Sequence, residues 1–174
     1  MAQHTDIDFS DLEVALFHQP WFRPCCIVDG AHRPSIALEL EDRGASFQCL
    51  FNGELEPEVA AVAPYLVDLE GQAALAEWLF SIGCGHNLGI YLLTGMEFLE
   101  VRKHFRRITM VRMPDDTVTY FRFYDPRVLR SFLPTCDENQ LRFIYGDVVE
   151  QFVFEDGDGA VASLRLDEIT ARVM

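Results

Sequence analysis

Short apolar runs alternate along this chain with segments in which apolar residues recur every three or four positions. Runs of roughly four to eight apolar residues are typical of buried strands, whereas the longer spacing is typical of amphipathic helices. Because the two kinds of segment alternate, the pattern predicts an α/β (mixed α+β) fold. We expect a single domain with a central mixed sheet flanked by helices and a C-terminal hairpin, since no repeat or linker divides the 174 residues.

The apolar runs predict strands, most of which end at a turn residue. These strands cover residues 25–30, 47–51, 63–69, 88–93, 108–113, 117–124, 148–154 and 160–166. Turn-forming residues at 114–116 and at 155–159 predict two hairpins, one between the fifth and sixth strands and one between the last two.

Helical spacing predicts helices over 9–17, 35–41, 54–63, 72–82, 95–107, 126–133 and 138–145. Thr94, with Glu97 three positions later, predicts a capping box at the start of the fifth helix, whose last turn is basic.

Local signals also fix the ends of the last two helices. Asp125 fits the N-cap position, and Pro126 fits the first helical position, where its missing N–H is not needed. Asp137 and Gln140 predict a second capping box, and Gly146 is expected to close that helix.

Charge narrows the choice of partners. The chain has 14 Lys and Arg against 28 Asp and Glu, a formal net charge of −14 and a pI near 4.6. Such a surface repels phosphate backbones and anionic lipids, so we expect neither a nucleic acid nor a membrane as partner. Two interpretations of the acidity stay open, namely plain solubility and the steering of a basic partner.

Cysteine usage and the N-terminal residues bear on the compartment. The five cysteines are an odd number and include no C-x-x-C pair, which is typical of free thiols in a reducing compartment. The first eleven residues are acidic and contain no apolar run, so they predict no signal peptide. A cytoplasmic location is therefore expected.

Residues that could form a catalytic or metal site are scattered along the sequence. Cys84 and His86 are the best candidates for a nucleophile and a base, but the glycines beside Cys84 favour a turn that would separate the two side chains. No metal-ligand motif, phosphate-binding loop or dinucleotide fingerprint occurs. The loop 156–159 fits a hairpin tip better than a calcium loop. We expect no catalytic residue, no metal and no cofactor.

The most specific signal is the segment 120–129, which reads Y-F-R-F-Y-D-P-R-V-L. It resembles the signature of a bacterial family of type VI secretion effector adaptors, first catalogued as a domain of unknown function. The matching positions are Phe121, Arg122, Tyr124, Asp125, Pro126, Arg127, Val128, Leu129, Gln140, Tyr145 and Gly146. One departure is Asp147, which stands where the family often has proline.

Further motifs of the same family occur upstream in the same order. They are Val28-Asp29-Gly30, Ala63-Pro64-Tyr65-Leu66-Val67, Gly89-Ile90 and His104-Phe105-Arg106. The resemblance therefore covers most of the chain, from about Cys26 to Val149.

The resemblance implies a non-enzymatic function. Members of this family are similar to chaperones that bind a toxic effector and help to load it onto the VgrG spike. The implied partners are thus a type VI effector and VgrG.

We expect an acidic N-terminal segment or helix at 1–22, an adaptor domain at 23–154, and a C-terminal strand and tail at 155–174 packed on that domain. Motif roles, either partner-binding or structural, fall to Asp29, Pro64, Tyr65, Arg122, Tyr124, Asp125, Pro126, Arg127, Leu129, Gln140, Tyr145 and Gly146.

Strand alternation gives the motif a physical interpretation. A strand through 117–124 would place Tyr120, Arg122 and Tyr124 on one face, and Phe121 and Phe123 on the core face. A covered Arg122 must then meet a carboxylate or carbonyl groups. Asp125 is expected both to cap the helix and to accept from an arginine, Arg127 or Arg122.

Two other functions remain open from the sequence. Small acidic proteins that neutralise toxins share this composition, so an immunity protein is the first alternative. A small hydrolase that uses Cys84 and His86 is the second.

Overall fold

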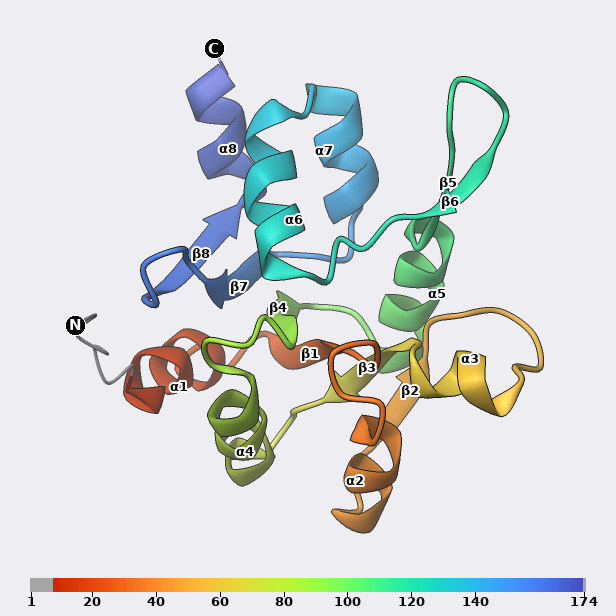
Figure 1. Ribbon diagram of the computed structural model, residues 1–174. Helices are drawn as coiled ribbons and strands as arrows, with labels where there is room; N and C mark the ends of the chain where they lie inside the picture. The colour runs from red at the N-terminus through yellow and green to blue at the C-terminus, as the bar shows by residue number, and fades with distance from the viewer. Residues whose placement is uncertain (1–7, 174) are drawn as a thin grey trace, which may run out of the picture.

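A computed structural model describes residues 8–173 and has helices on both sides of one central sheet (Figure 1). A separate two-stranded hairpin projects from one side of the molecule. The predicted mixed α+β single domain is confirmed. Residues 1–7 of the predicted N-terminal segment, and Met174 of the predicted tail, lie outside the described residues.

The central sheet has six strands and is antiparallel throughout. In spatial order they are β2 (Phe47–Cys49), β3 (Pro64–Asp68), β1 (Arg23–Asp29), β4 (Gly89–Thr94), β7 (Gln151–Glu155) and β8 (Val161–Arg165). The expected mixture of strand directions is wrong. Strands β3 and β4, which follow each other in the sequence, run parallel, but β1 lies between them and pairs antiparallel with both.

Two groups of helices cover the two faces of the sheet (Figure 1). One face carries α1 (Phe9–Phe17), α2 (Ile36–Asp42) and α4 (Ala73–Gly83). The other carries α5 (Phe98–Ile108), α6 (Pro126–Phe132), α7 (Glu138–Tyr145) and α8 (Leu166–Val173). The short helix α3 (Pro57–Ala61) lies beside β2, and a 3-10 turn, Leu133–Thr135, follows α6.

The core is divided by the sheet into two clusters. Along β1, Cys25 and Ile27 belong to the cluster under α5–α7, whereas Cys26 and Val28 belong to the cluster under α1, α2 and α4. Successive side chains of a strand point to opposite faces, so both faces of β1 are apolar and buried. This explains why the strand appears in the sequence as a continuous apolar run.

Two of the three predicted helix caps are confirmed. The side chain of Asp125 accepts from the backbone at the start of α6, and Asp137 and Gln140 form the predicted capping box of α7. The cap predicted at Thr94 is wrong, because Thr94 ends β4 and its hydroxyl accepts from the backbone N of Met96. The N-cap of α5 is Glu97.

The predicted hairpin at 108–124 is shorter than expected. Its strands are β5 (Met110–Arg112) and β6 (Val118–Tyr120), and Ile108 instead ends α5, where its side chain is buried. The C-terminal hairpin β7–β8 is confirmed, although Leu166 begins the helix α8, which the apolar pattern did not indicate. At the tip of that hairpin, the carboxylate of Asp156 accepts from the backbone N of Asp158 and of Ala160.

Candidate functional site: a carboxylate and arginine corner

The signature segment lies where the chain leaves the β5–β6 hairpin and enters α6, next to the end of β1. This arrangement brings Asp29 into contact with Arg122, although 93 positions separate them in the sequence. His32 also joins them. We call Asp29, His32, Arg122, Asp125 and Arg127 the corner.

Asp29 is the buried centre of the corner, with an exposed fraction of 0%. One carboxylate oxygen, Oδ1, accepts from the backbone N of Ala31 at 2.9 Å. The other, Oδ2, lies 2.9 Å from Nδ1 of His32 and accepts a short hydrogen bond from Nη2 of Arg122. A buried carboxylate needs such partners, because an unpaired buried charge is strongly destabilising.

Arg122 meets a carboxylate, as expected for this position. Its hydrogen bond to Asp29 is the main reason that the pKa of its guanidinium is raised. The side chain is nevertheless 42% exposed, so the guanidinium is only partly covered. Arg122 therefore joins two distant segments and still presents donors to solvent.

The strand alternation expected through Tyr124 is wrong. β6 ends at Tyr120, and the backbone then turns, with the N of Asp125 donating to the carbonyl of Arg122 at 3.0 Å. Phe123 and Tyr124 are consequently both buried, and the ring of Phe123 stacks on Phe105 of α5 with centroids 5.3 Å apart. Burial, followed by the negative charge of Asp29, raises the pKa of Tyr124 to about 12.

Asp125 has both of the roles expected for it. Its Oδ1 accepts from the backbone N of Arg127 at 2.9 Å and caps α6. The guanidinium of Arg127 also donates to both oxygens, at 3.0 and 2.7 Å. Burial alone would raise the pKa of Asp125, but the hydrogen bonds from Arg127 outweigh it and the pKa is lowered. Arg127 itself is 54% exposed.

Helix α6 is fixed by the other two motif residues of this segment. Pro126 occupies the first helical position and Leu129 is fully buried in the core below the corner. The corner is thus held in place by the end of β1, by the Asp125 cap of α6 and by the buried side chain of Leu129.

The first two of the four upstream motifs, Val28-Asp29-Gly30 and Ala63-Pro64-Tyr65-Leu66-Val67, are neighbours in the sheet. Asp29 pairs with Pro64 and Val28 pairs with Tyr65 in the β1–β3 ladder. A Cβ at Gly30 would lie 2.5 Å from the carbonyl oxygen of Ala63, so only glycine fits there. The hydroxyl of Tyr65 donates to the carbonyl of Ala60 at 2.6 Å.

The three remaining motif residues lie in and after α7, outside the corner. Gln140 is an exposed capping residue. The ring of Tyr145 is fully buried, and its hydroxyl donates to the carbonyl of Leu164 in β8 at 3.0 Å. Gly146 has φ +54°, and a Cβ there would lie 2.9 Å from the ring of His104. These contacts give all three residues structural roles.

Sequence reasoning missed His32. It lies three positions after Asp29 in the turn that follows β1, and its backbone N donates to the carbonyl of Asp29. The signal that could have found it is the spacing Asp-x-x-His directly after a buried strand, because such a turn folds the imidazole back onto the carboxylate.

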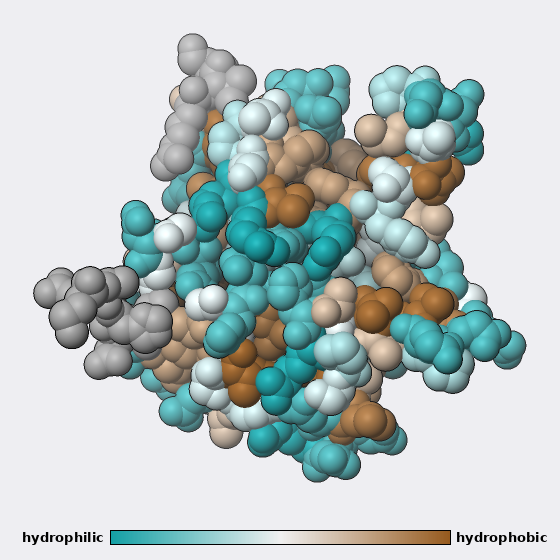
Figure 2. Space-filling view, in the orientation of Figure 1, coloured by the Kyte–Doolittle hydropathy of each residue, from teal (hydrophilic) through white to brown (hydrophobic). Residues whose placement is uncertain are grey.

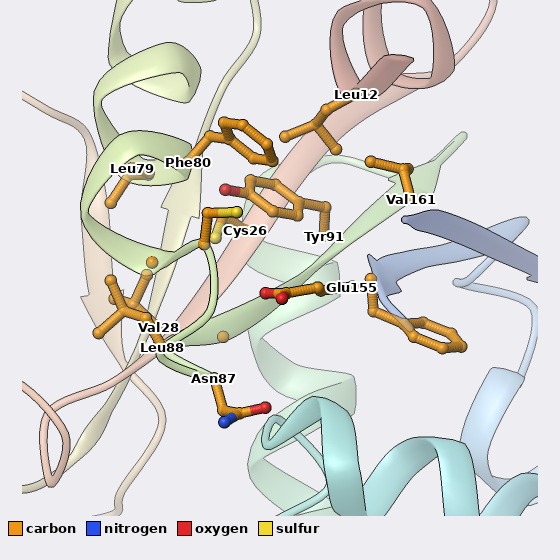
Figure 3. A pocket seen from close by; sticks show the side chains of 14 residues that line it. Leu12, Cys26, Val28, Leu79, Phe80, Asn87, Leu88, Tyr91, Glu155 and Val161 are labelled. Atoms are coloured by element: carbon orange, nitrogen blue, oxygen red, sulfur yellow. The ribbon is translucent and has the colours of Figure 1, made fainter. Parts of the chain in front are cut away.

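The Cys84 and His86 pair does not form a nucleophile and base. Cys84 lines a small pocket of about 30 Å³ between α1, α4 and the ends of β4 and β7, whereas His86 lines a different surface groove. Figure 3 shows the phenol of Tyr91 and the carboxylate of Glu155 at this pocket among apolar side chains. Its volume suffices for about two water molecules. Burial and then the charge of Glu155 raise the pKa of the Cys84 thiol, which disfavours a thiolate.

Within residues 8–173, no group of three or more His, Cys, Asp or Glu side chains is arranged to hold a metal ion. In the same part of the chain, no helix combines the length and the apolar character needed to cross a membrane.

Comparison with known proteins bears on the same residues. The model of the family described as a domain of unknown function, DUF4123, matches residues 26–142, more than half of the chain. The chain belongs to this family. The matched range includes the whole corner and all four upstream motifs of this DUF4123 protein. No curated protein and no solved structure matches it.

Proposed function

We propose that this DUF4123 protein is a cytoplasmic, non-catalytic adaptor-chaperone that binds a type VI secretion effector and helps to load it onto the VgrG spike. The proposal depends mainly on how the charged residues of the signature are paired. The carboxylates of Asp29 and Asp125 are both paired with arginines, and the corner holds together segments far apart in the sequence. Such a frame suits a binding scaffold better than a reaction site, which needs a reactive group with a matched pKa.

The surface also supports a binding function. Several large apolar side chains are exposed on α3 and on the β5–β6 hairpin, including Val59 at 39%, Met110 at 44% and Val118 at 53%. Figure 2 shows apolar surface near α3 and near the base of the β5–β6 hairpin. Exposed apolar patches of this kind are typical of protein interaction surfaces.

The decisive experiment is a pull-down of the tagged protein from its native host, with the bound proteins identified by mass spectrometry. We expect both a VgrG protein and a toxin to be retained, and we expect deletion of the gene to abolish secretion of that toxin alone. Retention of neither protein would refute the proposal.

The acidic surface favours one alternative, an immunity protein. The two functions predict different phenotypes. An immunity protein protects a susceptible cell that produces the toxin and is dispensable for its secretion, whereas an adaptor is required for secretion. Co-production with the toxin in a susceptible strain, followed by viable counts, separates them.

A further inference from the structure

Helix α5 and the following strand form a positively charged region in an acidic protein. From Val101 to Pro114 the sequence contains five of the fourteen basic residues and no acidic residue. These five are Arg102, Lys103, Arg106, Arg107 and Arg112. Lys103 is the only lysine of the chain.

The core fixes the orientation of this helix. Val101, His104, Phe105 and Ile108 are buried against the sheet and α7, and His104 donates from Nε2 to the carbonyl of Ile144 at 2.6 Å. One side of α5 is therefore committed to the core. Of the basic side chains between these residues, Lys103 and Arg107 are exposed on the outer side, whereas Arg102 and Arg106 are partly buried. Nε of Arg102 donates to the carbonyl of Cys49 at 3.2 Å.

The cations of α5 are poorly neutralised. Lys103 has one ion pair, with the exposed Glu100 on its own helix. None of the residues described by the structure forms an ion pair with Arg106 or Arg107, and the Nε of Arg106 is buried without a hydrogen-bond partner among them. The helix dipole favours cations in the last turn of α5, but it supplies no hydrogen-bond acceptor for Nε of Arg106.

These side chains line a groove. The groove has a volume of about 740 Å³ and is open to solvent. Its walls include Met96, Lys103, Arg106, Arg107 and Met110, together with one carboxylate, that of Glu100, which pairs with Lys103. The two methionines are 38% and 44% exposed, and methionine is common at surfaces that adapt to peptide partners. The groove thus offers cations and adaptable apolar contacts side by side.

We propose that the α5 groove is the docking site for an acidic segment of a partner protein that also carries apolar side chains. Carboxylates of that segment bind Lys103, Arg106 and Arg107, and its apolar side chains contact the methionines. Charge complementarity selects this occupant, because a protein with net charge −14 repels an acidic chain overall, whereas the segment from Val101 to Pro114 has five basic residues and no acidic one. The same net charge disfavours the much denser charge of a nucleic acid. This inference goes beyond the adaptor proposal, since it holds whichever protein supplies the segment.

The first test measures binding of a fluorescein-labelled peptide composed of Asp, Glu, Leu and Phe by fluorescence anisotropy, at two salt concentrations. We expect saturable binding that weakens with salt and that is lost when Asn and Gln replace the acidic residues of the peptide. Absence of binding, or equal binding of the neutral peptide, overturns the proposal. Tighter binding of a single-stranded DNA oligonucleotide than of the acidic peptide also overturns it.

A matched pair of variants locates the site. Lys103→Gln with Arg107→Gln removes two groove cations, and Arg43→Gln with Arg142→Gln removes the same charge elsewhere. Arg43 stacks on Trp78, and Arg142 pairs with Glu138 of its own helix. We expect about five- to tenfold weaker peptide binding for the groove variant and less than about twofold change for the control. Equal losses would mean that net charge alone drives binding, and they contradict the proposal.

Lys103 gives a second and independent measurement. When the fluorescein label blocks the amino group of the peptide, carbodiimide can join a peptide carboxylate only to Lys103 or to the α-amino group of the protein, because Lys103 is the only lysine. Coupling at Lys103, mapped by mass spectrometry, is expected. Coupling confined to the α-amino group overturns the proposal. These results do not depend on the pull-down, so failure of the adaptor proposal and failure of the groove proposal can be told apart.

Discussion

The corner and the α5 groove are both rich in arginine, but the arginines differ in what they contact. In the corner, Arg122 and Arg127 each donate to a carboxylate that is almost completely buried. In the groove, Arg106 and Arg107 have no carboxylate within reach among the described residues. The same side chain therefore stabilises the fold in one region and is available to a partner in the other. We expect substitutions in the corner to affect stability and those in the groove to affect binding.

The largest effect is expected for Arg122→Ala. It leaves Asp29 buried with only His32 and a backbone N–H beside it, so we expect the free energy of unfolding to fall by about 2–3 kcal/mol. The loss is smaller than for a fully buried pair because the arginine is 42% exposed. Urea denaturation measures it.

A double variant tests the reason for that loss. Asp29→Asn combined with Arg122→Ala removes the buried charge together with its partner, so we expect it to be more stable than Arg122→Ala alone. If Arg122→Ala melts like the wild type and yet loses partner binding, the arginine faces the partner and the contrast between the two regions fails.

A smaller loss is expected for Asp125→Ala. The substitution removes the N-cap of α6 and the acceptor of Arg127, which lowers the free energy of unfolding by about 1–2 kcal/mol. Asp125→Asn is the matched control, because asparagine still caps the helix. An Asn variant as unstable as the Ala variant would show that the ion pair, rather than the cap, dominates.

His104 makes the stability of α5 depend on pH. Burial lowers the pKa of this histidine below its ordinary value of 6.5. The unfolded chain then binds a proton at a pH where the folded protein does not, so stability is complete above about 6.5 and is lost as the pH falls below it. Chemical denaturation at pH 7.5 and 5.5 measures the loss, which we expect to be smaller in His104→Gln. An equal loss in that variant would assign the effect to other groups.

The smallest effect on stability is expected for Lys103→Gln. The lysine is exposed and its ion pair with Glu100 lies on the surface, so the free energy of unfolding should change by less than about 0.5 kcal/mol. Thermal melting checks this. A large destabilisation would place Lys103 with the corner arginines as a structural residue and remove the contrast.

Features that depend on residues close together in the sequence were predicted correctly, whereas features that depend on distant residues were not. The N-cap of α6, the capping box of α7 and the β7–β8 hairpin depend on contacts between residues close in the sequence, so Asp125, Asp137 and Gln140 could be identified from spacing alone. The strand direction could not, because it depends on where β1 inserts between β3 and β4. The helix α8 was also missed, because its first residue, Leu166, continues the apolar pattern of β8 and was assigned to the strand.

The candidate site divides in the same way. The residues of the signature could be named from their order, and a carboxylate partner for Arg122 could be expected from electrostatics. That the partner is Asp29, 93 positions away, could not be foreseen, and neither could His32 beside it.

Periodicity and local hydrogen bonding were enough to locate the helices and strands apart from α8, and the order of the residues was enough to identify the family signature. Which group each charged side chain contacts depends on the packing of segments far apart in the sequence. This packing paired Arg122 with a buried carboxylate and left Arg106 without a partner among the described residues. The physical reason is that a guanidinium can donate to any acceptor close to it in space, however far away that acceptor lies in the sequence. Whether it stabilises the fold or remains available to a partner depends on which acceptor the packed chain brings within about 3 Å.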